Sequence, residues 1–114
     1  MVKHIEIINY FIMLFIYMNI IIKPSHLADK KFDAIINNKK TIPFGASGMS
    51  DYTKHKDKDR KNWYLERHKN DNYNNPLYPS FYSNNLLWSK PTLKEAIQDT
   101  NRRYKNINIK LKRG

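Results

Sequence analysis

The predicted fold is organised around the stretch Phe44-Gly45-Ala46-Ser47-Gly48-Met49-Ser50-Asp51 and the charged segment that continues from it to His68. Gly45 and Gly48 permit backbone angles that other residues resist, so a turn is expected there. Ser50 or Asp51 can cap a following helix, because both side chains accept hydrogen bonds from early helix N–H groups. The pattern therefore predicts a tight turn that leads into a polar helix near residues 53–70.

Alternating apolar residues predict short strands before and after this helix. Residues 31–36 and 40–44 flank a cluster of turn residues, which is a β-hairpin pattern. Pro43 cannot donate to a strand ladder, so the second of these strands is an edge strand or ends there. Residues 19–23 and 107–112 add a first and a last strand. We therefore expect a small antiparallel sheet.

Two further helices are predicted near residues 80–88 and 93–104. The first contains the apolar cluster around Leu86-Leu87-Trp88, with Trp88 expected in the core. The second begins with Thr92-Leu93-Lys94-Glu95, which matches a capping box. Together with the strands, these helices give an α+β class and a single basic domain over residues 18–114.

The N-terminal segment is apolar and allows three interpretations. Ile7 to Ile22 is a run of 16 residues without charge, whereas a membrane-spanning helix usually needs about 20. Residues 1–17 are an apolar helical extension upstream of a natural start at Met18, a membrane anchor, or a helix that packs on the domain or a partner. If the segment spans a membrane, the excess of lysine after it leaves the basic domain in the cytosol.

The charge balance favours a polyanionic partner. The chain has 21 basic and 10 acidic residues and a net charge of +11, and a domain with that charge attracts polyanions. However, Asn, Ile, Lys and Tyr supply 52 of the 114 residues, which is also what an AT-rich gene produces. The absence of cysteine excludes disulfides and thiolate metal sites.

Cations interleaved with aromatic residues are the candidate nucleic-acid contacts, because such a surface can hold phosphates and stack bases. The candidates are Arg60, Lys61, Trp63 and Arg67 in the predicted helix, and Arg102, Arg103, Lys105, Lys110 and Lys112 near the C-terminus. The alternative is that Trp63 or Tyr64 belongs to the core and that the cations are only solvated. A phosphate-binding turn is a second candidate, since helix N-terminal N–H groups attract anions. It comprises Gly45, Ser47, Gly48 and Ser50, and its alternative is a plain strand–helix turn.

The histidines do not predict a catalytic or metal site. His55 and His68 are thirteen residues apart in the predicted helix, which separates them by about 20 Å along its axis. An HNH-like nuclease is the enzymatic alternative, because Arg67-His68 is followed by several asparagines, but this nuclease pattern needs a histidine on a strand before the helix. No catalytic residue, metal or cofactor is therefore predicted.

Several motifs taken together resemble a family of short basic proteins from large nucleocytoplasmic (giant) DNA viruses. The resemblance covers about residues 19–105. It rests on Lys30-Lys31-Phe32-Asp33-Ala34, Phe44-Gly45-Ala46-Ser47-Gly48, Ser50-Asp51-Tyr52-Thr53, His55, Asp57, Arg60-Lys61, Tyr64, Arg67-His68, Leu87-Trp88, Lys90-Pro91-Thr92-Leu93, Asp99 and Arg103. The chain departs from the family at Leu77-Tyr78-Pro79, where the family usually has a Thr-Ala-Gly element. The resemblance implies a viral source and a location in host cytoplasm or virion, without an assigned activity.

The sequence thus predicts a small, basic, non-enzymatic viral protein that binds the phosphate backbone of nucleic acid. The alternative is a structural or interaction module of virions or virus factories, tethered to a membrane through residues 7–22 if residues 1–17 are retained. A metal-dependent nuclease-like enzyme comes third. The sequence does not predict an oligomeric state.

Overall fold

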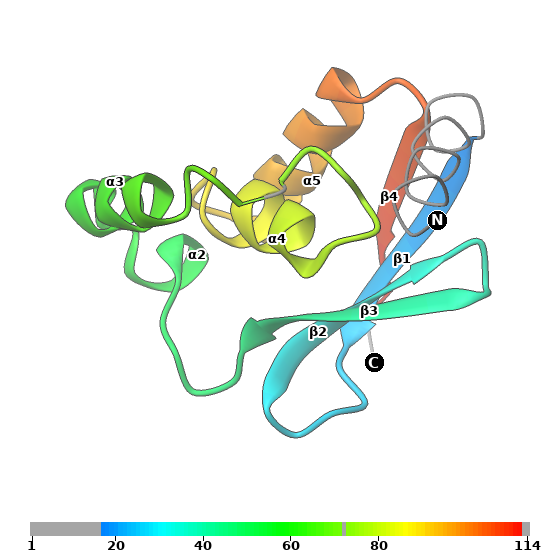
Figure 1. Cartoon of the computed structure of the whole chain (residues 1–114), viewed down its shortest axis with the longest axis horizontal. Coiled ribbons are helices and arrows are strands. Elements are labelled where there is room, and N and C mark those ends of the chain that lie inside the picture. The colour runs from blue at the N-terminus through cyan, green and yellow to red at the C-terminus, as the bar shows by residue number, and fades with distance from the viewer. Residues whose placement is uncertain (1–16, 72, 113–114) are drawn as a thin grey trace, which may run out of the picture.

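The computed structural model describes residues 17–71 and 73–112, which form an α+β domain as predicted (Figure 1). Its strands have the order β3-β2-β1-β4 in one mixed sheet. They are β1 (Met18–Pro24), β2 (Lys30–Ile36), β3 (Lys40–Ala46) and β4 (Ile107–Leu111). The prediction that β3 is an edge strand, made from Pro43, is confirmed.

The expectation of a purely antiparallel sheet is wrong for one pair of strands. β1 and β2 are antiparallel, as are β2 and β3, but β4 runs parallel to β1 and pairs Met18 with Ile107 and Ile20 with Ile109. All the helices of the described chain lie between β3 and β4 in the sequence. The chain can therefore return to the sheet in the direction of β1 after a crossover, as parallel pairs require.

One face of the sheet forms the core because apolar side chains alternate along each strand. Ile20 pairs with both Ile36 and Ile109, and Phe32 pairs with Phe44. The helices that cover this face are α4 (Pro79–Tyr82), the π-helix η1 (Ser83–Leu87) and α5 (Leu93–Arg103). Buried residues of these helices complete the core: Phe81, Tyr82, Leu86, Leu87, Ala96 and Ile97.

The predicted helix over residues 53–70 is in fact two helices, α2 (Tyr52–His55) and α3 (Lys58–Arg67). Lys56 adopts a left-handed backbone with φ of 56°, which ends α2. Asp57 then caps α3 by accepting hydrogen bonds from the amides of Asp59 and Arg60. The single polar helix expected near residues 53–70 is therefore broken at Lys56 and Asp57. The predicted cap at Asp51 is confirmed, since its carboxylate accepts from the amide of Thr53.

The second and third predicted helices are present, with one local difference. Residues near 80–88 form α4 followed by η1, so the last turn of this segment is a π-helix rather than an α-helix. α5 begins at the predicted cap, where the Thr92 hydroxyl accepts from the amide of Glu95. Trp88 follows η1 and is only half-buried, but it packs against the core as expected.

α3 projects away from the sheet (Figure 1). It contains no buried residue, although it carries Trp63 and Tyr64. The sheet therefore does not cover the aromatic residues of this helix. Tyr64 packs instead on Trp88, which follows η1.

The C-terminal part of the apolar run Ile7–Ile22 belongs to the sheet. Met18 to Ile22 lie in β1, and Ile22 is fully buried in the core. This confirms the strand predicted at 19–23 and contradicts a membrane helix that would extend as far as Ile22. In the described part of the chain, no helix is long and apolar enough to cross a bilayer. The predicted helical extension over residues 1–17 lies outside the described residues, except for Tyr17.

Candidate functional site

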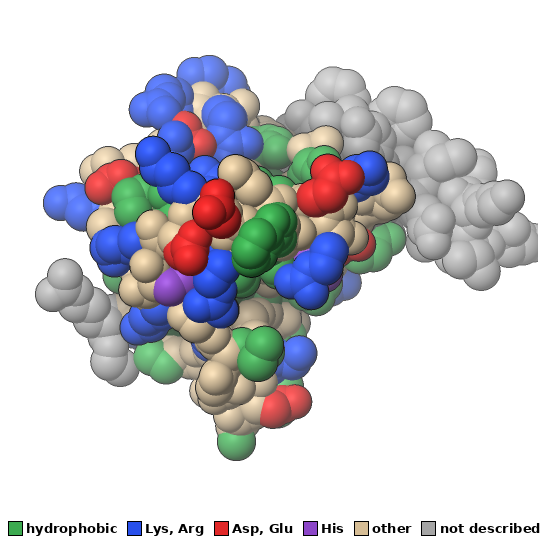
Figure 2. All heavy atoms as spheres, turned by 90° about the vertical axis from the view of Figure 1, so that its left-hand side faces the viewer, with side chains coloured by type: hydrophobic (Ala, Val, Ile, Leu, Met, Phe, Trp, Pro, Cys, Tyr) green, Lys and Arg blue, Asp and Glu red, His purple; other side chains and the backbone are tan. Residues whose placement is uncertain are grey.

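A cleft of about 850 Å³ lies beside α3. Its other walls come from the ends of β2 and β3, the turn after β3, and the segment from α4 to Trp88. Figure 2 views the α3 side of the molecule and shows lysine and arginine side chains spread over it, with apolar side chains between them. We call this space the α3 cleft. The residues that line it include Lys30, Arg60, Trp63, Tyr64, Arg67 and His68.

Cations without an acidic partner line the α3 cleft. Among residues 17–71 and 73–112, Lys30, Arg60 and Arg67 form no ion pair. Lys31 differs, because its ammonium group is bound to the buried carboxylate of Asp51. The cleft therefore offers several positive groups to a ligand, and opposing charge from Asp51 is largely neutralised by Lys31.

Stacked rings form one wall of the cleft. The rings of Tyr64 and Trp88 are parallel within 3°, and their centroids are 4.1 Å apart. The His68 ring also packs on Tyr64, with a distance of 4.2 Å between the two centroids. Burial, together with the nearby Asp71 carboxylate, raises the pKa of the Tyr64 phenol. These rings pack on each other and so support α3.

Trp63 is used differently from Tyr64. Its side chain is 66% exposed, and no aromatic ring of the described chain stacks on it. The interpretation of Trp63 as a core residue is therefore wrong, whereas Tyr64 does contribute to packing. A large exposed apolar side chain contributes little to folding, so its position beside unpaired cations indicates a surface that contacts a ligand.

The glycine turn contributes to the cleft wall but does not present free helix amides. Gly45 (φ 76°) and Ser50 line the α3 cleft, whereas Ser47 lines a neighbouring pocket of about 510 Å³. The Ser47 amide already donates to the carbonyl of Asp29. At the start of α2, the amide of Thr53 already donates to the Asp51 carboxylate and is not available to a phosphate. Gly48 (φ 83°) faces open space.

Lys61 is a structural residue rather than a free cation. Its Nζ donates to the carbonyl oxygen of Ser89 at 2.7 Å and lies 4.9 Å from the centroid of the Tyr52 ring. Burial, followed by repulsion from Lys90 and Lys58, lowers the pKa of Lys61. Its contacts tie α3 to the segment after η1.

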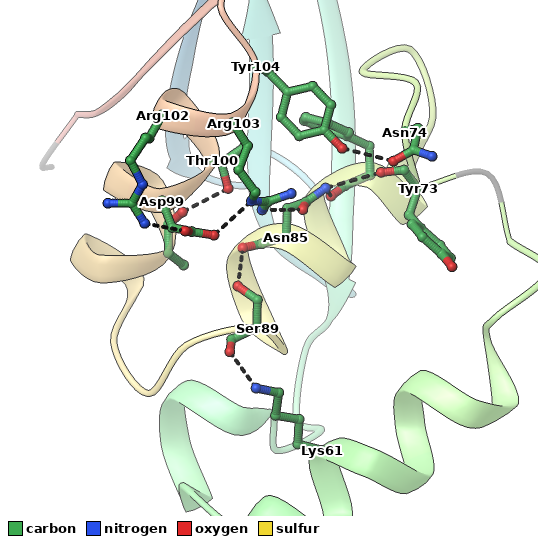
Figure 3. Close-up of polar contacts among 12 residues, drawn as sticks. Lys61, Tyr73, Asn74, Asn85, Ser89, Asp99, Thr100, Arg102, Arg103 and Tyr104 are labelled. Atoms are coloured by element: carbon green, nitrogen blue, oxygen red, sulfur yellow. Dashed lines mark hydrogen bonds and ion pairs between the residues drawn. The ribbon is translucent and has the colours of Figure 1, made fainter.

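The predicted C-terminal cluster divides into two groups. Arg102 and Arg103 both bind Asp99 (Figure 3). The donor–acceptor distances are 2.5 Å for Arg102 and 2.8 Å for Arg103. Arg103 also donates to Oδ1 of Asn85 at 2.7 Å, so it joins α5 to η1. Burial raises the pKa of Asp99, but its bonds to Arg103 and Arg102 outweigh this effect and hold the pKa below its usual value.

The remaining C-terminal cations lie on or near β4. Lys105, Lys110 and Lys112 are exposed, but none of them lines the α3 cleft. The two clusters predicted from the sequence therefore do not form one surface around this cleft.

A buried carboxylate on β2, which binds the β1–β2 connection, has no counterpart among the residues predicted from the sequence. Asp33 is 1% exposed, and it accepts hydrogen bonds from Ser25 Oγ at 2.7 Å and from the amide of His26 at 3.0 Å. The Nδ1 atom of His26 lies 2.5 Å from its second oxygen. Burial raises the pKa of Asp33, but these bonds outweigh it and the pKa is lowered. Asp33 occupies a position that alternation assigns to the outer face, so the sequence provided no signal for its burial.

The histidines do not converge on a metal. Across the part of the chain that is described, no three His, Asp or Glu side chains lie close enough to hold an ion. His68 instead ends α3 and lies 2.7 Å from Asp71. His55 accepts a hydrogen bond from the amide of Asp57 and packs near Trp88.

Comparison with known proteins identifies a similarity to a protein family. A family model described as "Family of unknown function (DUF5754)" matches residues 20–68, which run from β1 to the residue after α3. The matched segment contains Lys30, Arg60, Trp63 and Arg67, although no activity is attached to it. No curated protein and no solved structure matches the chain.

Proposed function

We propose that this protein binds nucleic acid through the α3 cleft, without acting as an enzyme. One observation carries the proposal: Arg60, Trp63 and Arg67 line the same cleft as Lys30. The three cations among them, Lys30, Arg60 and Arg67, have no ion pair within the described residues. Cations provide phosphate contacts, and an exposed aromatic ring provides a stacking surface. The net charge of +11 supports the same partner. The viral source implied by the resemblance stays a prediction.

The proposal has a quantitative consequence for salt. If Lys30, Arg60 and Arg67 each neutralise one phosphate, binding releases the counterions condensed on three phosphates. The slope of log K against log salt is then about −2 for a single strand and about −3 for a duplex. More exposed lysines in contact would make the slope steeper, whereas a slope near zero would contradict phosphate binding.

The experiment measures anisotropy of a labelled oligonucleotide with the full chain at salt concentrations from about 50 to 200 mM. The test variant is Arg60→Gln with Arg67→Gln. The matched control is Lys105→Gln with Lys110→Gln, which removes the same charge from exposed positions outside the cleft. We expect the test variant to lose at least about tenfold in affinity, because charge-assisted hydrogen bonds are strong. The control should lose much less.

Two results would refute the proposal. Equal losses in the two variants would mean that net charge, rather than the cleft, attracts the nucleic acid. Absence of binding even at the lowest salt would exclude a nucleic-acid ligand. The interaction module predicted as an alternative would then take its place.

A further inference from the structure

We infer that the ligand of the α3 cleft is an unpaired strand, with one base stacked on Trp63 and neighbouring phosphates held by Arg60 and Arg67. This inference rests on the proposed function and makes it more specific. It concerns the chemistry that single-stranded DNA and single-stranded RNA share.

The spacing of the three residues supports a shared ligand. Arg60 precedes Trp63 by three positions and Arg67 follows it by four, so the three side chains lie on one side of α3. The seven residue-to-residue steps from Arg60 to Arg67 span about 10 Å along the helix axis. Along the helix axis, Arg60 therefore lies before Trp63 and Arg67 lies after it. A strand that crosses the indole ring in this direction would meet one guanidinium group before the ring and one after it.

The exposure of Trp63 identifies it as the stacking surface. Trp88 has Tyr64 stacked at 4.1 Å on its ring and His55 at 5.4 Å, so a base cannot reach it without displacing them. Trp63 is 66% exposed and lines the cleft. A base that stacks on an aromatic ring contributes affinity with little dependence on its identity.

The charges around α3 argue against a duplex. At about 100° per residue, Arg60 and Arg67 lie on one flank of Trp63, whereas Asp59 and Glu66 lie on the opposite flank. Only the cationic flank lines the cleft. In a duplex groove phosphates run along both sides of an inserted helix, and one backbone would then face the two carboxylates. A single strand can follow the cationic flank alone, and its bases are free to stack.

The experiment compares a labelled single strand of about 10 nucleotides, a length within the range that one small domain covers, with the same strand in a duplex. DNA and RNA versions form separate arms. Three variants of the full chain are measured: Trp63→Leu, Trp63→Phe and the control Tyr78→Leu, which alters an exposed aromatic residue outside the cleft. Circular dichroism verifies that each variant is folded.

We expect tighter binding of the single strand than of the duplex. Trp63→Leu should weaken single-strand binding by about 5- to 150-fold, the range found for loss of one stacked base. Trp63→Phe should retain most of the affinity, and Tyr78→Leu should match the wild type. Binding should also quench the tryptophan emission of the wild type, and most of this quenching should be absent in Trp63→Phe.

The outcomes separate this inference from the proposed function. Equal or tighter duplex binding, or equal effects of Trp63→Leu and Tyr78→Leu, would overturn the inference. The cleft would still be a phosphate-binding site if the Arg60 and Arg67 double variant remained defective. Failure to bind either form would refute both. If only the DNA or only the RNA arm binds, the inference holds and the type of nucleic acid is identified.

Discussion

Replacement of Asn85 by alanine tests the polar network that joins η1 to α5. Asn84 and Asn85 are neighbours on η1 and are equally buried, each with 7% of its surface exposed. Asn85 donates to the carbonyls of Phe81 at 2.9 Å and Tyr73 at 3.1 Å, and it accepts from Arg103 at 2.7 Å. Neither polar atom of the Asn84 side chain has a hydrogen-bond partner among the described residues. The two asparagines therefore form a matched pair.

The expected magnitude follows from these contacts. A neutral hydrogen bond contributes about 1 kcal/mol net, and one to a charged group contributes about 1.5–3 kcal/mol. Loss of the three bonds of Asn85 thus destabilises the protein by roughly 3–5 kcal/mol, and the higher helix propensity of alanine offsets about 0.5 kcal/mol. We expect a net loss of about 3 kcal/mol for Asn85→Ala. Asn84→Ala breaks no hydrogen bond to the described residues, so its stability should stay within about 1 kcal/mol of the wild type.

Urea unfolding followed by circular dichroism measures both variants. With a slope of about 1–2 kcal/mol per molar urea for a domain of this size, Asn85→Ala should lower the midpoint by about 2 M. The slope itself should not change. Equal midpoints for the two variants, or a larger loss for Asn84→Ala, would refute the conclusion that hydrogen bonding by Asn85 joins η1 to α5.

Other predictions concern the β1–β2 connection, the glycine turn and the base of α3. The lowered pKa of Asp33 means that its contribution to stability is complete above its ordinary pKa of 3.8 and is lost as pH falls through the lower folded-state value. Asp33→Asn should cost roughly 2 kcal/mol of unfolding free energy at neutral pH and reduce the loss of stability at acidic pH, measured by urea unfolding against pH. Asp29→Asn, at an exposed position, should have neither effect. Gly45→Ala should lower the melting temperature more than Gly48→Ala, because both residues have positive φ but only at Gly45 does a Cβ approach Leu87 Cδ1, at 2.9 Å. Lys61→Met should lower the free energy of unfolding by about 1–2 kcal/mol, since it breaks the bond from Nζ to Ser89.

Each of these predictions has a result that would contradict it. An acid limb that is unchanged in Asp33→Asn would show that this carboxylate does not control the pH dependence. Equal melting temperatures for the two glycine variants would mean that the contact with Leu87 is relieved without cost. Wild-type stability in Lys61→Met would leave that lysine available as a ligand contact, as the sequence analysis first assigned it.

The strands could be predicted because their residues carry a strong local pattern. Alternation of apolar residues located β1, β2 and β3 to within two residues, and Pro43 identified an edge. The parallel direction of β4 has no local signal, since it depends on the path of the chain through the helices. The break at Lys56 was also missed, because a lysine in the left-handed region is set by the cap at Asp57 and not by its own propensity.

The cleft was only partly predictable. Arg60, Trp63 and Arg67 were chosen because cations and an aromatic ring share helical spacing, and the structure brings them together. Lys61 satisfied the same criterion but points to Ser89. Lys30 has no such signal, because it reaches the cleft from the start of β2, about thirty residues before α3 in the sequence. Periodicity identifies the face of a helix, whereas the partner of each long side chain depends on contacts between elements.

The two edges of the sheet carry features that oppose aggregation. β3 begins with Lys40 and contains Pro43, which has no amide proton to offer a neighbouring strand. On the opposite side, β4 carries Lys110 and is followed by Lys112. Charged lysines and proline on edge strands hinder pairing with the strands of another molecule. Lys110 and Lys112, which the sequence suggested as ligand contacts, are therefore explained by their position alone, because they keep the isoleucine-rich strands of separate molecules apart.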